Sequence, residues 1–271
     1  MKAVPYTMWR VAVVLSLTLG VYASYASGQA VMNIQQATLT EADQKAPEIS
    51  TEELRKILAG KTATVFDARP FNEYAVSHIP GALNVSAKPG VSIALYVSDV
   101  AEIGRVVQGN KAVPLVLYCN GPFCGKSRRL AEELLAAGYT NVRRYQLGIP
   151  VWRALGGITE IEAEGLQYVR EKDQTAVWID VREPEEFAAN PIPNARNLPF
   201  SGVKPGKDVG EVRKAKDDGR LPMEDHNTRI VVFGRDGAQA QAMAEAIARE
   251  AFHNVSYFAG PFERLRTAGV R

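Results

Sequence analysis

The sequence predicts an α/β protein made of two tandem modules, each with a parallel sheet flanked by helices. The first observation is an internal repeat. Residues 64–85 align with residues 177–198 at a constant offset of 113 residues. The second observation is an alternation of buried-strand and helix patterns inside each repeat, which is typical of parallel sheets covered on both faces. A chain of 271 residues is long enough for two such domains.

Identical residues at equivalent positions support the interpretation as a repeat. Asp67 and Arg69 of the first copy align with Asp180 and Arg182 of the second, and the asparagine of the first copy, Asn84, also has its counterpart. The same register returns near the end of each copy. A single register at both ends indicates that a whole domain is duplicated.

Within the first copy, the apolar runs 63–66 and 115–118 predict buried strands, and residues 51–58 and 127–137 show helical spacing. Between them these segments give the order helix, strand, strand, helix. Parallel strands need crossover connections, usually helices, because the carboxyl ends of all the strands lie at the same edge of the sheet.

Capping signals mark the ends of these helices. Ser50 or Thr51 can cap the first helix with Glu53 three residues after Ser50, and Gly138 can end the helix that precedes it. We therefore expect a module one at residues 48–157 and a module two at 160–271, with a linker or tail at 31–47.

The N-terminus has the layout of a secretory signal. Lys2 and Arg10 precede or flank the apolar stretch 11–21, small residues follow, and no acidic residue occurs before Glu41. The apolar stretch is short for a membrane span. We expect residues 1–30 to be a signal peptide and the mature protein to be periplasmic or secreted, without a membrane contact. An uncleaved anchor is the alternative.

The charge balance indicates no polyanionic partner. Removal of the expected signal peptide takes away two of the 32 basic side chains and none of the 30 acidic ones, so the mature protein is close to neutral. No basic stripe with interleaved aromatic residues is present. The sequence therefore favours no nucleic-acid interaction.

Both cysteines lie in the stretch LYCNGPFCGKSRRL, residues 117–130. Cys119 follows a predicted strand and precedes a helix, the position at which open α/β sheets carry their sites. Loop N–H groups, the positive end of the helix, Lys126 and Arg128 would favour a thiolate at Cys119. We therefore predict that Cys119 is a nucleophile. A buried, inert cysteine is the alternative.

Three other functions fit this loop poorly. A Walker A loop needs a glycine where Asn120 stands, and a cysteine-dependent phosphatase needs an arginine where Gly125 stands. A metal site needs more ligands than two cysteines, and His78, His226 and His253 are not at ligand spacing. We expect no metal.

The pair of cysteines leaves a further hypothesis open. Cys119 and Cys124 are five residues apart, so a disulfide between them would close a small loop and stabilise little. In an oxidising compartment the pair could instead form a reversible redox disulfide. Alternatively, Cys124 could resolve or protect a modified Cys119, or only fill the loop.

The motifs together resemble those of rhodaneses, the sulfurtransferases. They are DAR at 67–69, EYAVSHIPGALNV at 73–85, the strand that ends in Cys119, and LGIPVW at 147–152. The resemblance covers roughly residues 48–271 and implies two tandem rhodanese-like domains. It also implies that Cys119 accepts a sulfur atom from a donor such as thiosulfate and passes it on as a persulfide.

The resemblance further implies roles for neighbouring residues. Asp67, Arg69 and His78 would be structural, and no cofactor is expected. The donor would be a small sulfur-containing anion and the acceptor a thiol, cyanide or a protein. The implied loop that binds the substrate consists of Asn120, Gly121, Phe123, Cys124, Gly125, Lys126, Ser127 and Arg128. For Lys126 and Arg128, an exposed helix face is an equally open interpretation.

Module two keeps the fold signals without the nucleophile. Gly234 stands where Cys119 does, and residues 158–271 contain no cysteine. Module two would therefore be a scaffold or a docking surface. Two departures leave the donor open: the loop after Cys119 is two residues longer than the short rhodanese form that module two retains, and Glu73 stands where two-domain thiosulfate enzymes of the family have an arginine. A recognition protein with vestigial catalysis is a third hypothesis.

Overall fold

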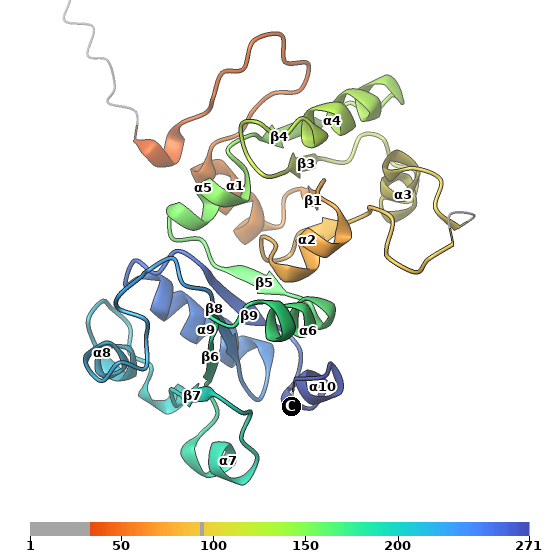
Figure 1. Cartoon of the computed structure of the whole chain (residues 1–271). Helices are drawn as coiled ribbons and strands as arrows, with labels where there is room; N and C mark the ends of the chain where they lie inside the picture. Colours follow the sequence, from red (N-terminus) through yellow and green to blue (C-terminus); the bar gives the residue numbers. More distant parts are fainter. Residues whose placement is uncertain (1–32, 93–94, 271) are drawn as a thin grey trace, which may run out of the picture. The chain divides into compact units, whose positions relative to one another are not determined.

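The computed structural model describes residues 33–92 and 95–270. The expected signal peptide, residues 1–30, lies outside this part. The described chain contains two parallel sheets, with strand orders β2-β1-β3-β4 and β5-β9-β8-β6-β7. Helices flank both sheets (Figure 1), so the predicted fold class is confirmed.

Ahead of and within module one the elements are η1 (Ile34–Gln36), α1 (Thr51–Gly60), β1 (Thr64–Asp67), α2 (Phe71–Val76), β2 (Leu83–Asn84), α3 (Asp99–Val106), β3 (Leu115–Tyr118), α4 (Lys126–Ala136), β4 (Val142–Tyr145) and α5 (Gly148–Ala154). Module two consists of β5 (Thr159–Ile161), α6 (Ala163–Lys172), β6 (Val177–Asp180), α7 (Pro184–Ala189), β7 (Ala195–Asn197), η3 (Phe200–Gly202), α8 (Gly210–Asp217), β8 (Ile230–Phe233), α9 (Gly237–Ala248), β9 (Val255–Phe258) and α10 (Phe262–Thr267).

The two sheets have the same topology, as the repeat requires. Strands β1, β2, β3 and β4 take the places of β6, β7, β8 and β9. The fifth strand of the second sheet, β5, corresponds to a single parallel bridge between Glu48 and Arg144 in the first. Module one therefore has the same architecture with a shortened edge.

Alternation along the central strand distributes side chains to two cores. Leu115 and Leu117 of β3 pack in one apolar cluster with α3 and α4, whereas Val116 and Tyr118 pack in another with α1 and α5. All four residues are fully buried. A continuous apolar run is what a parallel strand covered on both faces requires.

The predicted helix start in module one is confirmed. The Ser50 side chain accepts a hydrogen bond from the N–H of Glu53, and the Glu53 carboxylate accepts one from the N–H of Ser50. This capping box satisfies two backbone donors that the helix itself cannot. At the end of α4, Gly138 has a φ of 90°, the left-handed conformation that stops a helix.

The segment expected to be a linker packs against module one. Ala46 is buried in its core, and Glu48 accepts hydrogen bonds from the N–H groups of Leu39, Thr40 and Glu41. Arg144 of β4, itself buried, donates to the Glu41 carboxylate at 2.8 Å. Residues 33–47 thus cover one edge of the first sheet.

Strand β5 connects the modules through its backbone. The N–H of His78 donates to the carbonyl of Glu160 at 2.9 Å, and the N–H of Glu160 donates back to His78 at 2.8 Å. The N–H of Glu162 donates to Ala75 at the end of α2. At Gly165 of α6 a Cβ atom would lie 2.0 Å from the Ala75 carbonyl oxygen, so only glycine permits this close helix contact.

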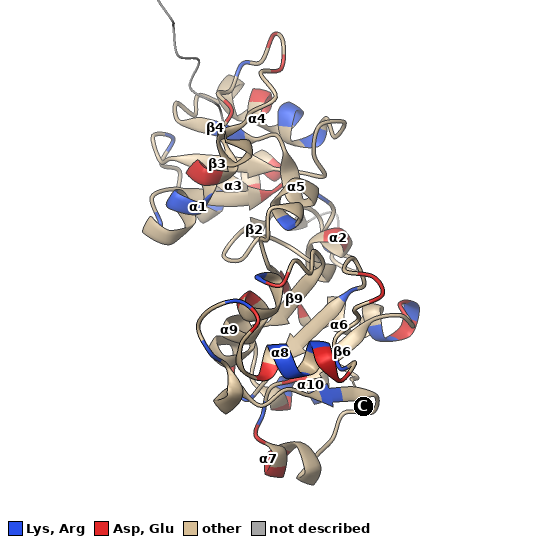
Figure 2. Cartoon of the chain, turned by 90° about the vertical axis from the view of Figure 1, so that its left-hand side faces the viewer, with Lys and Arg blue, Asp and Glu red and all other residues tan. Residues whose placement is uncertain are grey.

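Basic and acidic residues both occur along the chain in each module (Figure 2). Among the described residues, none of the helices combines the length and the apolar character needed to cross a bilayer.

Candidate active site

Cys119 lies directly after β3, between the sheet and the start of α4. Only 1% of the surface of Cys119 is exposed to solvent. The Cys119 carbonyl accepts a hydrogen bond from the N–H of Ile149 at 3.1 Å, which ties the beginning of the loop to α5. The position of Cys119 is therefore set by backbone contacts on both sides.

Two glycines let the loop pack against the turn between β4 and α5. Gly148 has a φ of 67°, and a Cβ there would lie 2.3 Å from the Gly121 nitrogen and 2.5 Å from the Cys119 oxygen. Gly121 has a φ of 96°, with the carbonyl oxygen of Leu147 3.1 Å from the place of a Cβ. Side chains at either position would displace the loop. The sequence motif LGIPVW contained Gly148, but spacing alone did not identify it as a site residue.

Cys119 and Cys124 form a disulfide. Their Cα atoms are 6.2 Å apart, within the range that a disulfide can bridge. The two cysteines are five residues apart, so the disulfide closes a short loop and stabilises little, as expected from the sequence. The bond nevertheless has a chemical consequence, because the oxidised pair contains no thiolate. The predicted nucleophile is available only after reduction.

Helix α4 begins without a side-chain cap. Its N-cap residue is Gly125, and within residues 33–92 and 95–270 no side chain accepts from the first turn as a cap. The first N–H groups of this 11-residue helix therefore remain available for an anion. Lys126, the first residue of α4, is exposed and makes no side-chain hydrogen bond or ion pair in the described chain.

Arg128 is already engaged elsewhere. Its guanidinium donates to the Glu132 carboxylate at 3.3 Å and lies 3.9 Å from that of Glu41. Arg129 pairs with Glu133 on the outer face of α4 at 3.5 Å. Of the two basic residues proposed to hold a donor, Lys126 is thus the unpaired one.

Three further loop residues differ in their contacts and in their exposure to solvent. Asn120 donates to the Glu73 carboxylate of α2 at 2.5 Å, which brings a negative charge next to the loop. The ring of Phe123 is fully exposed at 103%. Ser127 is buried in the first turn of α4.

Asp67 and Arg69 form a buried ion pair below the loop. The guanidinium Nε lies 2.9 Å from Oδ1 of Asp67 and Nη2 lies 2.5 Å from Oδ2. Nη2 also donates to the Ser77 carbonyl at 2.6 Å, and Asn84 donates to the carbonyls of Asp67 and Arg69. Burial alone would lower the pKa of Arg69, but the hydrogen bonds that Arg69 donates to the Asp67 carboxylate, and the charge of that carboxylate, outweigh burial and raise the pKa. The network connects β1, α2 and β2.

His78 lies apart from this loop, at the contact between module one and β5. A cavity of about 510 Å³ opens between α2 and α6, and its lining includes Arg69, Glu73 and Arg153. Cys119 does not line it. Burial, followed by the charges of Arg229 and Arg69, lowers the pKa of Arg153 to about 10.

Module two retains the buried Asp–Arg pair, which we call the frame. Its counterpart of the Cys119 position has no space for a side chain. Arg182 binds Asp180 with the same bidentate geometry, at 3.0 Å from Nε and 2.6 Å from Nη2. At Gly234 a Cβ would lie 2.5 Å from Cγ2 of Val181, a position that is alanine in module one. Asp236 caps α9 by accepting from the N–H of Gln239.

Comparisons with known proteins agree with this geometry. Residues 50–155 and 165–268 each match the family described as "Rhodanese-like domain". The human (Homo sapiens) thiosulfate:glutathione sulfurtransferase is 32% identical over 117 residues, which cover 40% of this chain and 93% of the human protein.

Two further matches span smaller parts of their counterparts. A putative mitochondrial thiosulfate sulfurtransferase of Schizosaccharomyces pombe is 27% identical over 89 residues, 32% of this chain and 61% of the yeast protein. The crystal structure of a thiosulfate sulfurtransferase from Pseudomonas aeruginosa aligns with 80% of this chain and 44% of its own, at 22% identity and a TM-score of 0.34.

The two matched regions each contain one copy of the buried Asp–Arg pair and most strands of one sheet. The chain therefore belongs to the rhodanese-like family as a member with tandem domains, and its similarity to sulfurtransferases supports an activity of that kind.

Proposed function

We propose that module one transfers sulfane sulfur from thiosulfate or a related anion to a thiophilic acceptor through a persulfide on Cys119. The single observation that carries this proposal is the position of Cys119, at the end of β3 and ahead of the uncapped first turn of α4. Module two has a glycine at the corresponding place and would act as a scaffold.

The reaction would begin after an external dithiol reduces the Cys119–Cys124 disulfide by thiol–disulfide exchange and is itself oxidised to a disulfide. The Cys119 thiolate would attack the outer sulfur of thiosulfate, form a sulfur–sulfur bond and release sulfite with the electron pair of the broken bond. A thiol, cyanide or a protein would then accept the outer sulfur and regenerate the Cys119 thiolate. Both steps conserve charge and need no cofactor.

The electrostatics of the loop support this chemistry. Unpaired N–H groups at the start of α4 and the unpaired cation of Lys126 would stabilise the anionic persulfide and the leaving sulfite. The carboxylate of Glu73 beside Asn120 would act in the opposite direction. The exposed ring of Phe123 gives an acceptor protein an apolar contact next to the reacting sulfur.

Intact-protein mass spectrometry tests the proposal directly. The chain is reduced, freed of reductant and exposed to thiosulfate. We expect a mass increase of about 32 Da, one sulfur atom, in the wild type and in Cys124→Ser, and no increase in Cys119→Ser. An adduct that persists in Cys119→Ser, or no adduct on the reduced wild type with any sulfane donor tested, would contradict the proposal.

The disulfide favours a second candidate function, a thiol redox module that exchanges Cys119–Cys124 with other thiols. The two functions differ in their dependence on Cys124. A redox function is lost in Cys124→Ser, whereas the first step of sulfur transfer is retained. Equilibration with glutathione buffers, followed by thiol labelling, measures the redox function independently of any sulfur donor.

A further inference from the structure

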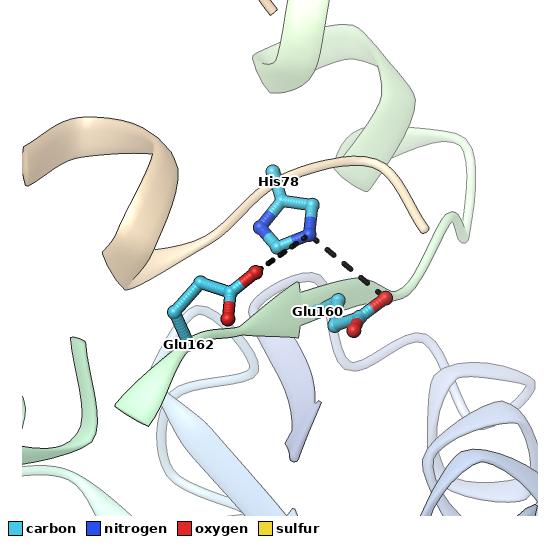
Figure 3. A group of neighbouring side chains, drawn as sticks. All are labelled: His78, Glu160 and Glu162. Atoms are coloured by element: carbon cyan, nitrogen blue, oxygen red, sulfur yellow. Dashed lines mark ion pairs between the residues drawn. The ribbon is translucent and has the colours of Figure 1, made fainter. Parts of the chain in front are cut away.

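Three side chains that the proposed function does not use converge where the modules meet. His78 belongs to the turn after α2, and Glu160 and Glu162 belong to β5 or follow it. Backbone hydrogen bonds between His78 and Glu160, in both directions, fix the two segments against each other. Figure 3 shows both carboxylates directed toward the imidazole ring.

The tautomer of His78 is set by a neighbouring carbonyl. Nδ1 lies 3.0 Å from the carbonyl oxygen of Tyr74, and the imidazole stacks on the Tyr74 ring with 3.9 Å between ring centres. A carbonyl oxygen can only accept, so in the neutral ring the proton is on Nδ1 and Nε2 carries a lone pair. Many histidines that bind a metal through one ring nitrogen likewise donate a hydrogen bond from the other nitrogen to a carbonyl or carboxylate.

The imidazole is buried, with 2% of the His78 side chain exposed. Its Nε2 atom makes no hydrogen bond in the described part of the chain. It lies 3.9 Å from Oε2 of Glu160 and 3.9 Å from Oε1 of Glu162.

Three electron-pair donors therefore face one another. The carboxylate of Glu160 comes from β5 and that of Glu162 from the residue after it, and both approach Nε2 of His78. The hydroxyl groups of Tyr257 and Tyr74 donate weakly to Glu160 and Glu162, at 3.4 and 3.3 Å.

We propose that His78, Glu160 and Glu162 bind a divalent transition-metal ion such as Zn²⁺ at the contact between the two modules. One imidazole nitrogen and two carboxylate oxygens are a ligand set for Zn²⁺. Their ligand atoms all lie within 4.8 Å of one another. Zinc bonds of about 2.1 Å place ligands about 3.4 Å apart. Each carboxylate oxygen, now 3.9 Å from Nε2, therefore needs to approach that nitrogen by about 0.5 Å, and the two oxygens also need to approach each other.

The exposure of the ligands fits such a site. Glu160 and Glu162 are 22% and 38% exposed in their side chains, so an ion can enter and water can complete its coordination. Sequence spacing did not suggest this site, because about eighty residues separate the histidine from the carboxylates. A bound ion would connect module one to module two in addition to the backbone hydrogen bonds.

Zinc titration of the cysteine-free protein provides the test. The full chain carries Cys119→Ser and Cys124→Ser, which removes thiol ligands, and has no histidine tag. We expect one Zn²⁺ per chain by calorimetry and a higher Tm with Zn²⁺ than with a chelator. Glu160→Gln together with Glu162→Gln should weaken binding by roughly 100-fold or more.

Matched variants make the result specific. Glu186→Gln removes a carboxylate of similar exposure that pairs with Arg235 outside the site, and should leave Zn²⁺ affinity unchanged. The single variant Glu162→Gln, at a partly exposed position, should weaken binding without unfolding the chain. Absence of stoichiometric binding, or an unchanged affinity in the Glu160 and Glu162 double variant, would overturn the proposal. Because the test protein lacks both cysteines, its outcome is independent of sulfur transfer.

Discussion

The two modules share the buried Asp–Arg pair, the frame. They differ at the end of the central strand, which is β3 in module one and β8 in module two. Asp67–Arg69 and Asp180–Arg182 superpose in every hydrogen bond, down to the asparagine that donates to both backbone carbonyls. At the end of the central strand, one module has a cysteine and the other a glycine. The frame thus has a structural role that persists without the nucleophile.

The difference extends beyond the missing thiol. Beside Gly234 stands Val181, where module one has Ala68. The helix that follows is capped by the Asp236 carboxylate, whereas α4 has Gly125 at that place. Space and positive potential are both reduced in module two, so restoring a cysteine alone would not restore the site.

The largest effect is expected from the shared frame. Asp67→Asn and Asp180→Asn each leave a buried guanidinium without its counter-charge, and each should lower the free energy of unfolding by ~3–5 kcal/mol. Urea denaturation measures this. Asp217→Asn, which breaks the exposed pair with Arg213, should cost only ~0.5 kcal/mol or less. Losses below ~1 kcal/mol in either module would contradict an equivalent frame.

A cysteine introduced into module two tests the packing difference. Gly234→Cys forces a Cβ against Cγ2 of Val181 and should destabilise the protein by ~1–3 kcal/mol. Adding Val181→Ala provides the space found in module one and should recover most of that loss. A double variant as unstable as Gly234→Cys would show that another contact closes this position.

The charge at the start of α4 can be changed to match module two. Gly125→Asp places a carboxylate where Asp236 stands in α9, and the position has open space for a side chain. We expect persulfide formation on reduced Cys119 to slow about tenfold relative to the neutral control Gly125→Asn. A mass-spectrometric time course with thiosulfate gives the rates. Equal rates would indicate that the helix terminus does not assist the reaction.

The smallest effect concerns helix capping. Ser50→Ala removes the capping box of α1 and should lower the free energy of unfolding by about 1 kcal/mol. The N-cap of α6 is Glu162, whose side chain accepts no capping bond. In a buffer with chelator, Glu162→Gln should therefore change stability by less than ~0.5 kcal/mol. A larger loss would show that this carboxylate stabilises the helix.

The sequence predicted what local pattern and repetition encode. Alternating apolar runs located β1 and β3, Ser50 and Glu53 located the start of α1, and the offset of 113 residues paired the two Asp–Arg motifs. Contacts between distant side chains were not accessible in this way. The approach of Arg128 to Glu41 depends on where residues 33–47 fold back.

The chemical state of the loop was also beyond sequence spacing. Whether Cys119 and Cys124 meet depends on the loop backbone, which Gly121 and Gly148 bend into place. Likewise, the convergence of His78 with the two glutamates arises only because β5 lies along the turn after α2. The sequence pattern singled out Cys119, Cys124 and His78, but not the two glutamates, and tertiary structure determined the partners in both cases.

The backbone contact between His78 and β5 has a consequence for truncation. In the intact chain, the turn after α2 satisfies the outward N–H and C=O groups of Glu160. A fragment that begins near residue 158 would expose that strand edge to solvent, and exposed edges pair with other chains. An isolated second module should therefore self-associate, whereas a fragment cut elsewhere in the protein need not.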